Sequence, residues 1–212
     1  MESRSIKIKS AQNSKLSIDI IPGHFATSHS HVNYYVDMTK IKHCIAMAQE
    51  AAATLASNYR GTPVDTIVCL EGCETVGALL ARELTSAGYV SMNEKKELCV
   101  ITPEFVPGGQ LIFRDNIQPM LWNKSVLLLL SSVTTGKTVK RALECIRYYG
   151  GNVAAVSSIF SAIGQVGELP IHSIFNADDL PGYQTCSLKE CPECAKQHKI
   201  DAIINSYGYS RV

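Results

Sequence analysis

Apolar residues along this chain recur with two different spacings. Near the amino terminus they alternate with polar residues over Ser5–Lys9 and Leu16–Ile21, with a polar turn between the two stretches. Alternation with a period of two indicates half-buried strands, so we expect an antiparallel pair here. Over Thr39–Tyr59 the apolar residues recur at helical spacing instead, and Gly61 and Pro63 follow. This pattern predicts a long helix that ends before the glycine.

Short, fully apolar stretches alternate with helical patterns in the middle of the chain. Such stretches are typical of strands that are buried on both faces of a parallel sheet. The pattern predicts strands over 66–70, 98–101, 110–113, 126–130 and 153–160, a Pro/Gly-rich loop over 103–109, and helices over 76–87, ended by Gly88, and over 136–149. Repeated strand–helix–strand units predict an α/β fold, with a central, mostly parallel sheet flanked by helices.

The pattern also divides the chain into a core and two end segments. A chain of 212 residues buries roughly 70% of its unfolded surface, which is enough for one sizeable core. We expect this core over residues 39–164, an amino-terminal segment over 1–38 and a carboxy-terminal segment over 165–212. Beyond Gly164 the pattern weakens into short segments, and the two ends are expected to form a small appended hood lobe.

Composition and charge argue against several classes of protein. Hydrophobic residues make up 46% of the chain and charged residues 18%, which is ordinary for a globular protein. The formal net charge of +1 gives no electrostatic footprint for nucleic acid, and no apolar run has the length of a membrane span. The first residues lack the apolar stretch of a signal peptide. We therefore expect a cytoplasmic protein that binds neither nucleic acid nor a membrane, with its cysteines reduced.

The strongest chemical signal in the chain is the stretch VLLLLSSVTTGKT, Val126–Thr138. A buried strand leads through hydroxyl residues into a helix, which places backbone N–H groups and the positive end of a helix dipole at one point. Such a point binds anions. We therefore predict phosphate binding by Thr134, Thr135, Gly136, Lys137 and Thr138.

Two other interpretations of this stretch stay open. The nucleotide-binding P-loop has the form GxxxxGK[ST], and its end matches Gly136–Thr138. Its first glycine, however, falls on Ser131, and the next apolar strand has no carboxylate for a magnesium ion. In the other interpretation Thr134 or Thr135 simply caps the helix and nothing binds. A cap and an anion site use the same N–H groups, so both predict the same helix start.

Four segments in order carry a resemblance to a known family. They are Val126–Thr138, HVNYYVDMTKI at 31–41, LEGCETVGALLARELTSAG at 70–88, and CPEC at 191–194. Together they resemble the type I phosphoribosyltransferases, and orotate phosphoribosyltransferases most closely. In that family a TTGxT-like tail follows four apolar residues and an acidic pair. The resemblance implies the type I phosphoribosyltransferase fold with a small hood lobe formed by both ends of the chain.

The resemblance also implies a ligand, phosphoribosyl pyrophosphate or a nucleoside 5′-monophosphate, and a place in nucleotide metabolism. In the family the TTGxT-like tail holds the 5′-phosphate, a turn lies against the pyrophosphate and the amino-terminal lobe covers a pyrimidine base. Carried over, the turn is Glu71, Gly72, Cys73, Glu74 and Thr75, and the base pocket is His29, His31 and Tyr34. His24, His29 and His31 lie within eight residues and could instead bind a metal or meet a substrate carboxylate. A polar loop for the histidines and a packing role for Tyr34 are the simpler alternatives. Mg²⁺, if the protein is catalytic, and a homodimer are further implications.

Two parts of the family's transferase site differ in this chain. The acidic pair that holds the ribose hydroxyls falls on Leu130 and Ser131, and leucine accepts no hydrogen bond from a diol. The stretch 100–115, which carries catalytic cations in the family, has no lysine or histidine and only Arg114 near its end. The catalytic residues are therefore unknown. Two functions stay open: an orotate phosphoribosyltransferase-like enzyme, and a non-catalytic ligand-sensing or regulatory protein on the same fold.

The carboxy-terminal segment carries a separate, metal-binding pattern. Cys186, Cys191, Cys194 and His198 follow the spacing C-x4-C-x2-C-x3-H. Two thiolates from a tight turn are a common way to hold tetrahedral zinc, so we predict a structural Zn²⁺ on these residues. The alternative is a set of free thiols with His198 on the surface.

Overall fold

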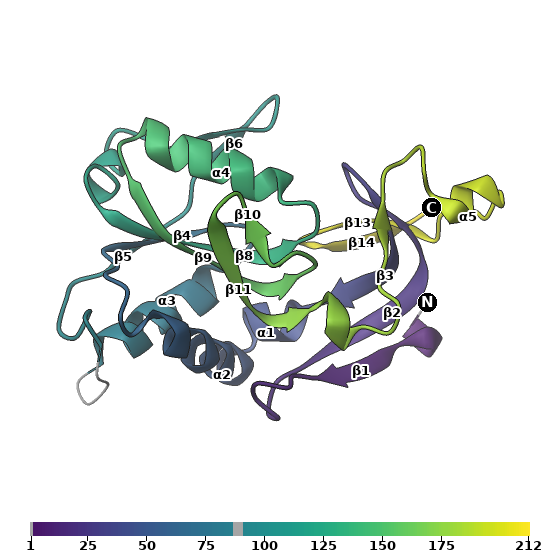
Figure 1. Ribbon diagram of the computed structural model, residues 1–212, viewed down its shortest axis with the longest axis horizontal. Coiled ribbons are helices and arrows are strands. Elements are labelled where there is room, and N and C mark those ends of the chain that lie inside the picture. Colours follow the sequence, from purple (N-terminus) through teal and green to yellow (C-terminus); the bar gives the residue numbers. More distant parts are fainter. Residues whose placement is uncertain (1, 87–90) are drawn as a thin grey trace.

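The computed structural model describes residues 2–86 and 91–212. A layered α/β core lies beside a smaller lobe rich in β-strands, which we call the hood (Figure 1). Both ends of the chain lie in the hood. The predicted α/β fold with a central, mostly parallel sheet is confirmed.

The central sheet has the strand order β10–β11–β9–β8–β4–β5. These strands are β4 (Thr66–Cys69), β5 (Cys99–Ile101), β8 (Ser125–Val133), β9 (Asn152–Ser161), β10 (Gln165–Val166) and β11 (Leu169–Asn176). Neighbouring strands run parallel, apart from the antiparallel pair β10–β11. The leucine run of β8 is buried throughout, as expected for a central strand of a parallel sheet.

Helices cover both faces of this sheet (Figure 1). The α-helices are α1 (Thr39–His43), α2 (Ile45–Ala56), α3 (Glu74–Thr85), α4 (Lys137–Tyr148) and α5 (Pro192–Ala195), and the 3₁₀ turns are η1 (Glu2–Arg4), η2 (Ser57–Tyr59), η3 (Gln118–Met120) and η4 (Ala177–Asp179). Residues of α2 and α3 share a hydrophobic cluster with Leu127 and Leu129, whereas residues of α4 share another with Leu128 and Leu130. Because side chains alternate along a strand, β8 contributes to both hydrophobic layers.

The hood is a second sheet, built from both ends of the chain. Its strand order is β12–β3–β2–β13–β14, and β1 pairs with β2. Its strands are β1 (Ile6–Lys9), β2 (Ser17–Ala26), β3 (His31–Asp37), β12 (Thr185–Cys186), β13 (Ala202–Asn205) and β14 (Gly208–Arg211). β13 runs parallel to β2, with Ala202 opposite Phe25. Through this pairing the hood sheet joins residues from the two ends of the chain.

Three sequence-based boundaries in the core need correction. The helix predicted over 39–59 is interrupted at Cys44, whose ψ of 117° is extended, and Ile45 is consequently 62% exposed although it fits the helical spacing. The helix predicted over 76–87 begins at Glu74 and ends at Thr85, and the predicted stop at Gly88 lies outside the described residues. The core continues past residue 164, because β11 pairs with β9. β11 is only partly buried, so its apolar pattern is too broken to predict a strand.

The predicted loop over 103–109 also contains regular structure. β6 (Glu104–Val106) pairs with β7 (Gln110–Ile112) in an antiparallel hairpin that is separate from the central sheet. The strand predicted over 110–113 therefore exists but belongs to this hairpin. Its side chains are exposed or partly exposed, which explains why the core pattern does not mark the partner strand.

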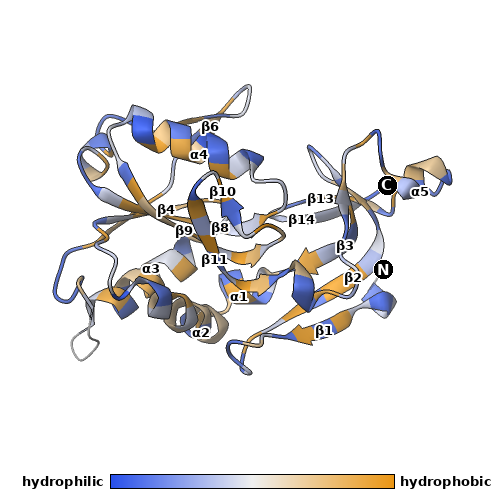
Figure 2. Cartoon of the chain, in the orientation of Figure 1, coloured by the Kyte–Doolittle hydropathy of each residue, from blue (hydrophilic) through white to orange (hydrophobic). Residues whose placement is uncertain are grey.

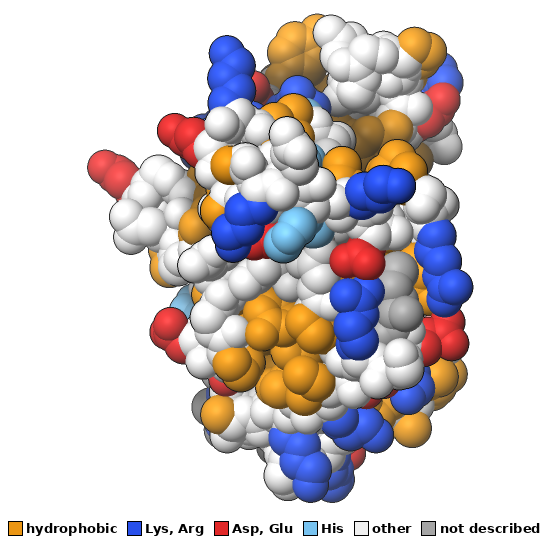
Figure 3. Space-filling view, turned by 90° about the vertical axis from the view of Figure 1, so that its right-hand side faces the viewer, with side chains coloured by type: hydrophobic (Ala, Val, Ile, Leu, Met, Phe, Trp, Pro, Cys, Tyr) orange, Lys and Arg blue, Asp and Glu red, His pale blue; other side chains and the backbone are white. Residues whose placement is uncertain are grey.

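The distribution of side chains agrees with a layered core. Figure 2 shows largely hydrophobic strands in the central sheet, with polar positions toward the outer surfaces of the helices. Seen from the hood end, basic and acidic side chains are interspersed around a hydrophobic patch (Figure 3). Among the described residues, no helix combines the length and the apolar character that crossing a bilayer requires.

A test of the core packing uses Gly77 on α3. A Cβ at this position would lie 2.3 Å from the Sγ of Cys69 on β4. Gly77→Ala should therefore lower the free energy of unfolding by about 1–3 kcal/mol, measured by chemical denaturation. Gly61 is the matched control, because a Cβ there meets no described atom within 4 Å. Equal effects of Gly77→Ala and Gly61→Ala would contradict this packing.

Candidate functional site

A cavity of about 400 Å³ lies between the core and the hood. The loop from β8 to α4 forms its core wall, and residues of β3 and of the turn after β13 form its hood wall. A cavity of this size is typical of small-molecule sites. The structure places the predicted phosphate-binding residues together on its wall: Thr134, Thr135, Gly136, Lys137 and Thr138.

The amino-terminal end of α4 faces this cavity. α4 begins at Lys137, after Gly136 with a φ of 74°, and no side chain of the described residues caps it. The alternative in which Thr134 or Thr135 caps the helix is therefore wrong. First-turn N–H groups have no partner inside a helix, so here they stay available to a ligand. Together with the positive end of the helix dipole they favour an anion.

A carboxylate lies beside the end of β8, although the sequence has no acidic pair there. The Oε2 of Glu71 accepts hydrogen bonds from the Ser131 hydroxyl at 2.6 Å and from the Ser132 N–H at 3.2 Å. Glu71 lines the cavity, whereas Leu130 is fully buried in the core. The sequence places Glu71 in the predicted pyrophosphate turn and contains no sign of this contact. The acidic group reaches the end of β8 from another loop.

Burial shifts the pKa of this carboxylate. It raises the pKa of Glu71 above its ordinary value, although the hydrogen bonds from Ser131 and Ser132 and the positive charge of Lys42 act in the opposite direction.

Of the residues predicted for the pyrophosphate turn, all described, only Glu71 lines the cavity. Gly72, Cys73, Glu74 and Thr75 lie outside its wall.

Lys42 ties the Glu71 turn to the hood. This α1 residue is only 3% exposed, and its ammonium group donates to the carbonyl of Glu71 at 3.2 Å and to the carbonyl of Ser206. Its Nζ also lies 5.7 Å from the centre of the Tyr207 ring, within range of a cation–π interaction. One buried cation thus joins the two turns that border the cavity.

Two of the three residues predicted for the base pocket lie on the cavity wall. His29 and Tyr34 line the cavity, but His31 does not. The Tyr34 hydroxyl donates to the carbonyl of Pro181 at 2.8 Å, which fixes this ring from the hood side. The His31 ring instead contacts His24, in a cluster outside the cavity. His31 is therefore corrected from a base-pocket residue to a member of that cluster.

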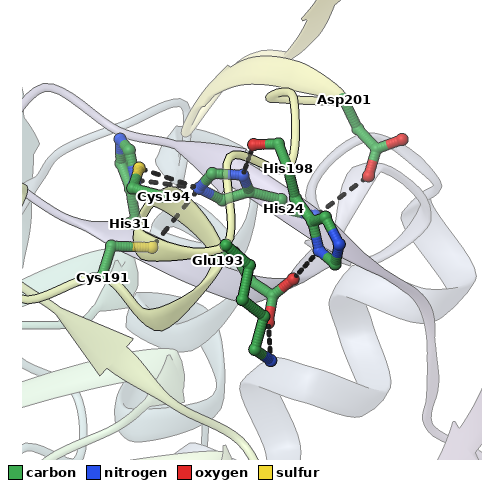
Figure 4. A network of polar contacts seen from close by, with 8 residues as sticks. His24, His31, Cys191, Glu193, Cys194, His198 and Asp201 are labelled. Carbon is green, nitrogen blue, oxygen red and sulfur yellow. Dashed lines mark hydrogen bonds and ion pairs between the residues drawn. The ribbon is translucent and has the colours of Figure 1, made fainter.

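This second cluster joins histidines and cysteines of the hood (Figure 4). Ligand atoms of His24, His31, Cys191 and Cys194 all lie within 4.8 Å of one another. The two cysteines belong to the predicted metal set. Both imidazoles come from β2 and β3, which the local cysteine spacing could not reveal.

The other two residues of the predicted metal set lie beside the cluster. The Nδ1 of His198 contacts the carboxylate of Glu193 instead, and the Sγ of Cys186 lies 3.6 Å from the carbonyl oxygen of His31. The structure thus brings Cys191 and Cys194 of the predicted set together with His24 and His31. Cys186 lies next to this group, in side-chain hydrogen-bond contact with Cys191.

The β6–β7 hairpin adds no charge to the cavity. Residues 100–115, all described, are absent from its wall. Arg114, the cation near the end of this stretch, forms an ion pair with Glu104 at 2.7 Å. In this arrangement the hairpin offers no unpaired cation to a ligand in the cavity.

Proteins with similar sequences are orotate phosphoribosyltransferases. The chain is 27% identical over 185 residues to the enzyme so named from Thermoanaerobacter sp., which covers 85% of this chain and 87% of the relative. It is 23% identical over 179 residues to that of Caldicellulosiruptor bescii, covering 82% and 85%. No family model matches the chain.

Solved structures with a similar backbone are also phosphoribosyltransferases. A phosphoribosyltransferase from Corynebacterium diphtheriae gives a TM-score of 0.55 at 17% identity, over 76% of this chain and 90% of that one. The chain has the type I phosphoribosyltransferase fold. The orotate phosphoribosyltransferase of Mycobacterium tuberculosis in complex with phosphoribosyl pyrophosphate gives 0.52 at 14% identity, over 69% and 83%. The resemblance drawn from the sequence segments is confirmed.

The type I phosphoribosyltransferase fold explains where the cavity lies. Ligands of open α/β sheets bind beyond the carboxyl ends of the parallel strands, and the β8–α4 loop leaves β8 at that end. The hood covers this edge through the turn after β13, at Asn205 and Ser206. The site therefore depends on contacts between the core and the hood.

A test of this junction removes the buried cation. Lys42→Met leaves the carbonyls of Glu71 and Ser206 without their donor, so the free energy of unfolding should fall by about 1–3 kcal/mol in chemical denaturation. Lys40 on the same helix is the matched control, because its side chain is 65% exposed and pairs with Asp19. Lys40→Met should have little effect, since exposed ion pairs contribute little. If Lys42→Met leaves the free energy of unfolding unchanged, the junction does not depend on this cation.

Proposed function

We propose that this chain binds a 5′-phosphorylated ribose, as phosphoribosyl pyrophosphate or a nucleoside 5′-monophosphate, in the cavity between the core and the hood. The observation that carries the proposal is that an uncapped helix end and a carboxylate line the same cavity. The first matches a phosphate and the second a sugar diol. The names of the similar proteins, orotate phosphoribosyltransferases, support the same ligand class.

In this proposal Glu71 replaces the missing acidic pair. A carboxylate accepts strong, charge-assisted hydrogen bonds from hydroxyl groups, and a ribose presents two neighbouring hydroxyls. The Ser131 and Ser132 hydrogen bonds both reach Oε2, so Oε1 is the oxygen left for the sugar. The 5′-phosphate then lies on the N–H groups around Gly136–Thr138, and a base lies toward His29 and Tyr34.

Mg²⁺ fits the same arrangement. It is usually bound through one or two carboxylates together with substrate phosphates, and Glu71 supplies a carboxylate on the cavity wall. When bound, the ion would neutralise charge on the pyrophosphate. Lys137, also on the wall, would face the 5′-phosphate.

A second candidate function is binding without transfer, as in a ligand-sensing or regulatory protein. One observation favours it: Arg114, the cation of the stretch that corresponds to the family's catalytic loop, is paired with Glu104. A leaving pyrophosphate needs positioned positive charge to stabilise the transition state. With this loop held as it is, the cavity would retain a phosphoribosyl ligand without breaking its glycosidic bond.

Calorimetric titration with inorganic phosphate and with ribose 5-phosphate tests the two proposed roles, phosphate binding at the start of α4 and sugar binding by Glu71. Gly136→Ala should weaken both ligands, because alanine is strained at a φ of 74° and its Cβ would lie 2.9 Å from Val166. Glu71→Gln should weaken ribose 5-phosphate by about tenfold through loss of charge-assisted hydrogen bonds. Its affinity for inorganic phosphate should not fall. Equal weakening of both ligands by Glu71→Gln would contradict a sugar-binding role.

Transfer is tested separately with phosphoribosyl pyrophosphate, orotate and Mg²⁺. If the second candidate is correct, the protein binds phosphoribosyl pyrophosphate in calorimetry but forms no orotidine monophosphate or pyrophosphate during incubation. Release of pyrophosphate that depends on orotate would identify an enzyme instead. Gly136→Ala is the control in both measurements, since it should reduce binding and any turnover together.

A further inference from the structure

The cluster in the hood has the dimensions of a tetrahedral metal site (Figure 4). The Nε2 of His24 lies 2.9 Å from the Nδ1 of His31, 3.4 Å from the Sγ of Cys191 and 3.6 Å from the Sγ of Cys194. The Cys194 Sγ is 3.3 Å from the His31 Nδ1. In a tetrahedral zinc site with bonds of about 2.0–2.3 Å, ligand atoms are about 3.3–3.8 Å apart. Of these four distances, only the one between the two imidazole nitrogens is clearly shorter, and all the ligand atoms lie within 4.8 Å of one another.

A hydrogen bond outside the cluster prepares His24 as a ligand. Its Nδ1 lies 3.1 Å from the carbonyl oxygen of His198. A carbonyl can only accept, so Nδ1 carries the hydrogen and Nε2 keeps a lone pair directed at the cluster. Metal-binding histidines usually donate their second ring N–H in this way. His198 thus contributes through its backbone rather than through its ring.

The segment that carries the two cysteines has almost no hydrophobic anchor. Of residues 184–199, all described, Cys191 alone is buried, and α5 is a single four-residue turn. His24 and His31, by contrast, are each 5% exposed within the hood sheet. A small segment without a core usually needs a disulfide or a metal to hold its structure, and these cysteines are free thiols.

We propose that His24, His31, Cys191 and Cys194 bind one zinc ion that fastens the carboxy-terminal segment to the amino-terminal strands. Two thiolates and two imidazoles in a tetrahedral arrangement favour zinc. The ion joins residues that are distant in sequence, since Cys191 and His24 are 167 positions apart.

The position of the site gives the ion a further effect. β13 begins at Ala202, shortly after α5, and pairs with β2 next to His24. Ile203, Ile204, Asn205 and Ser206 then line the cavity. The ion therefore holds the hood wall of the cavity in place without touching the ligand.

The test uses the full-length protein, purified under reducing conditions and loaded with zinc or cobalt. Elemental analysis should find one zinc per chain, and the cobalt form should show the intense visible absorption and the thiolate charge-transfer band of a tetrahedral site. His24→Asn and Cys191→Ser should each lose the zinc. An unaltered protein that takes up no zinc, or that gives a weak octahedral cobalt spectrum, would overturn the proposal. Because this spectrum is read on the unaltered chain, the result stands even where a variant fails to fold.

Matched controls distinguish this ligand set from the one that the cysteine spacing indicates. Cys186→Ser and His198→Asn should keep the zinc and the cobalt spectrum, since neither side chain belongs to the four whose ligand atoms all lie within 4.8 Å of one another. Loss of metal from either of these variants, with retention in His24→Asn, would overturn the assignment. Chelation should also lower the thermal midpoint of the unaltered protein and leave that of Cys191→Ser unchanged.

Discussion

The first turn of α4 presents backbone N–H groups that no described side chain caps. The rest of the site is arranged around these groups. Gly136 makes this possible, because its φ of 74° is a conformation that other residues rarely adopt. β8 holds the loop in place from one side, since its residues are buried between two hydrophobic layers. The anion site is thus a direct consequence of how the strand passes into the helix.

Two charged side chains, Glu71 and Lys42, border the site and are held by hydrogen bonds to other elements. Glu71 contributes a carboxylate that Ser131 and Ser132 hold by hydrogen bonds, while Lys42 holds the Glu71 carbonyl and the hood turn at Ser206. Removing a carboxylate or an ammonium from water is costly unless the group is hydrogen-bonded, and both Glu71 and Lys42 have such partners. The carboxylate beside the end of β8 therefore comes from a neighbouring loop and not from β8 itself.

The sequence predicted the parts of the structure that depend on local patterns. The leucine run of β8, the start of α4 near Gly136 and the α/β order all follow from periodicity and turn chemistry. The contacts that define the site do not. Glu71 meets Ser131 across 60 positions, and His24 meets Cys191 across 167, so neither pair leaves a spacing signature. For the same reason the pattern paired Cys191 with His198, its neighbour in sequence.

We propose that one ligand places its phosphate on the α4 end and its sugar diol on Glu71. A crystal structure of the protein with ribose 5-phosphate tests it most directly. The phosphate should lie within hydrogen-bond distance of the backbone N–H groups around Lys137 and Thr138, with ribose hydroxyls on the Glu71 carboxylate. A phosphate bound elsewhere, or a ribose whose hydroxyls point away from Glu71, would contradict it.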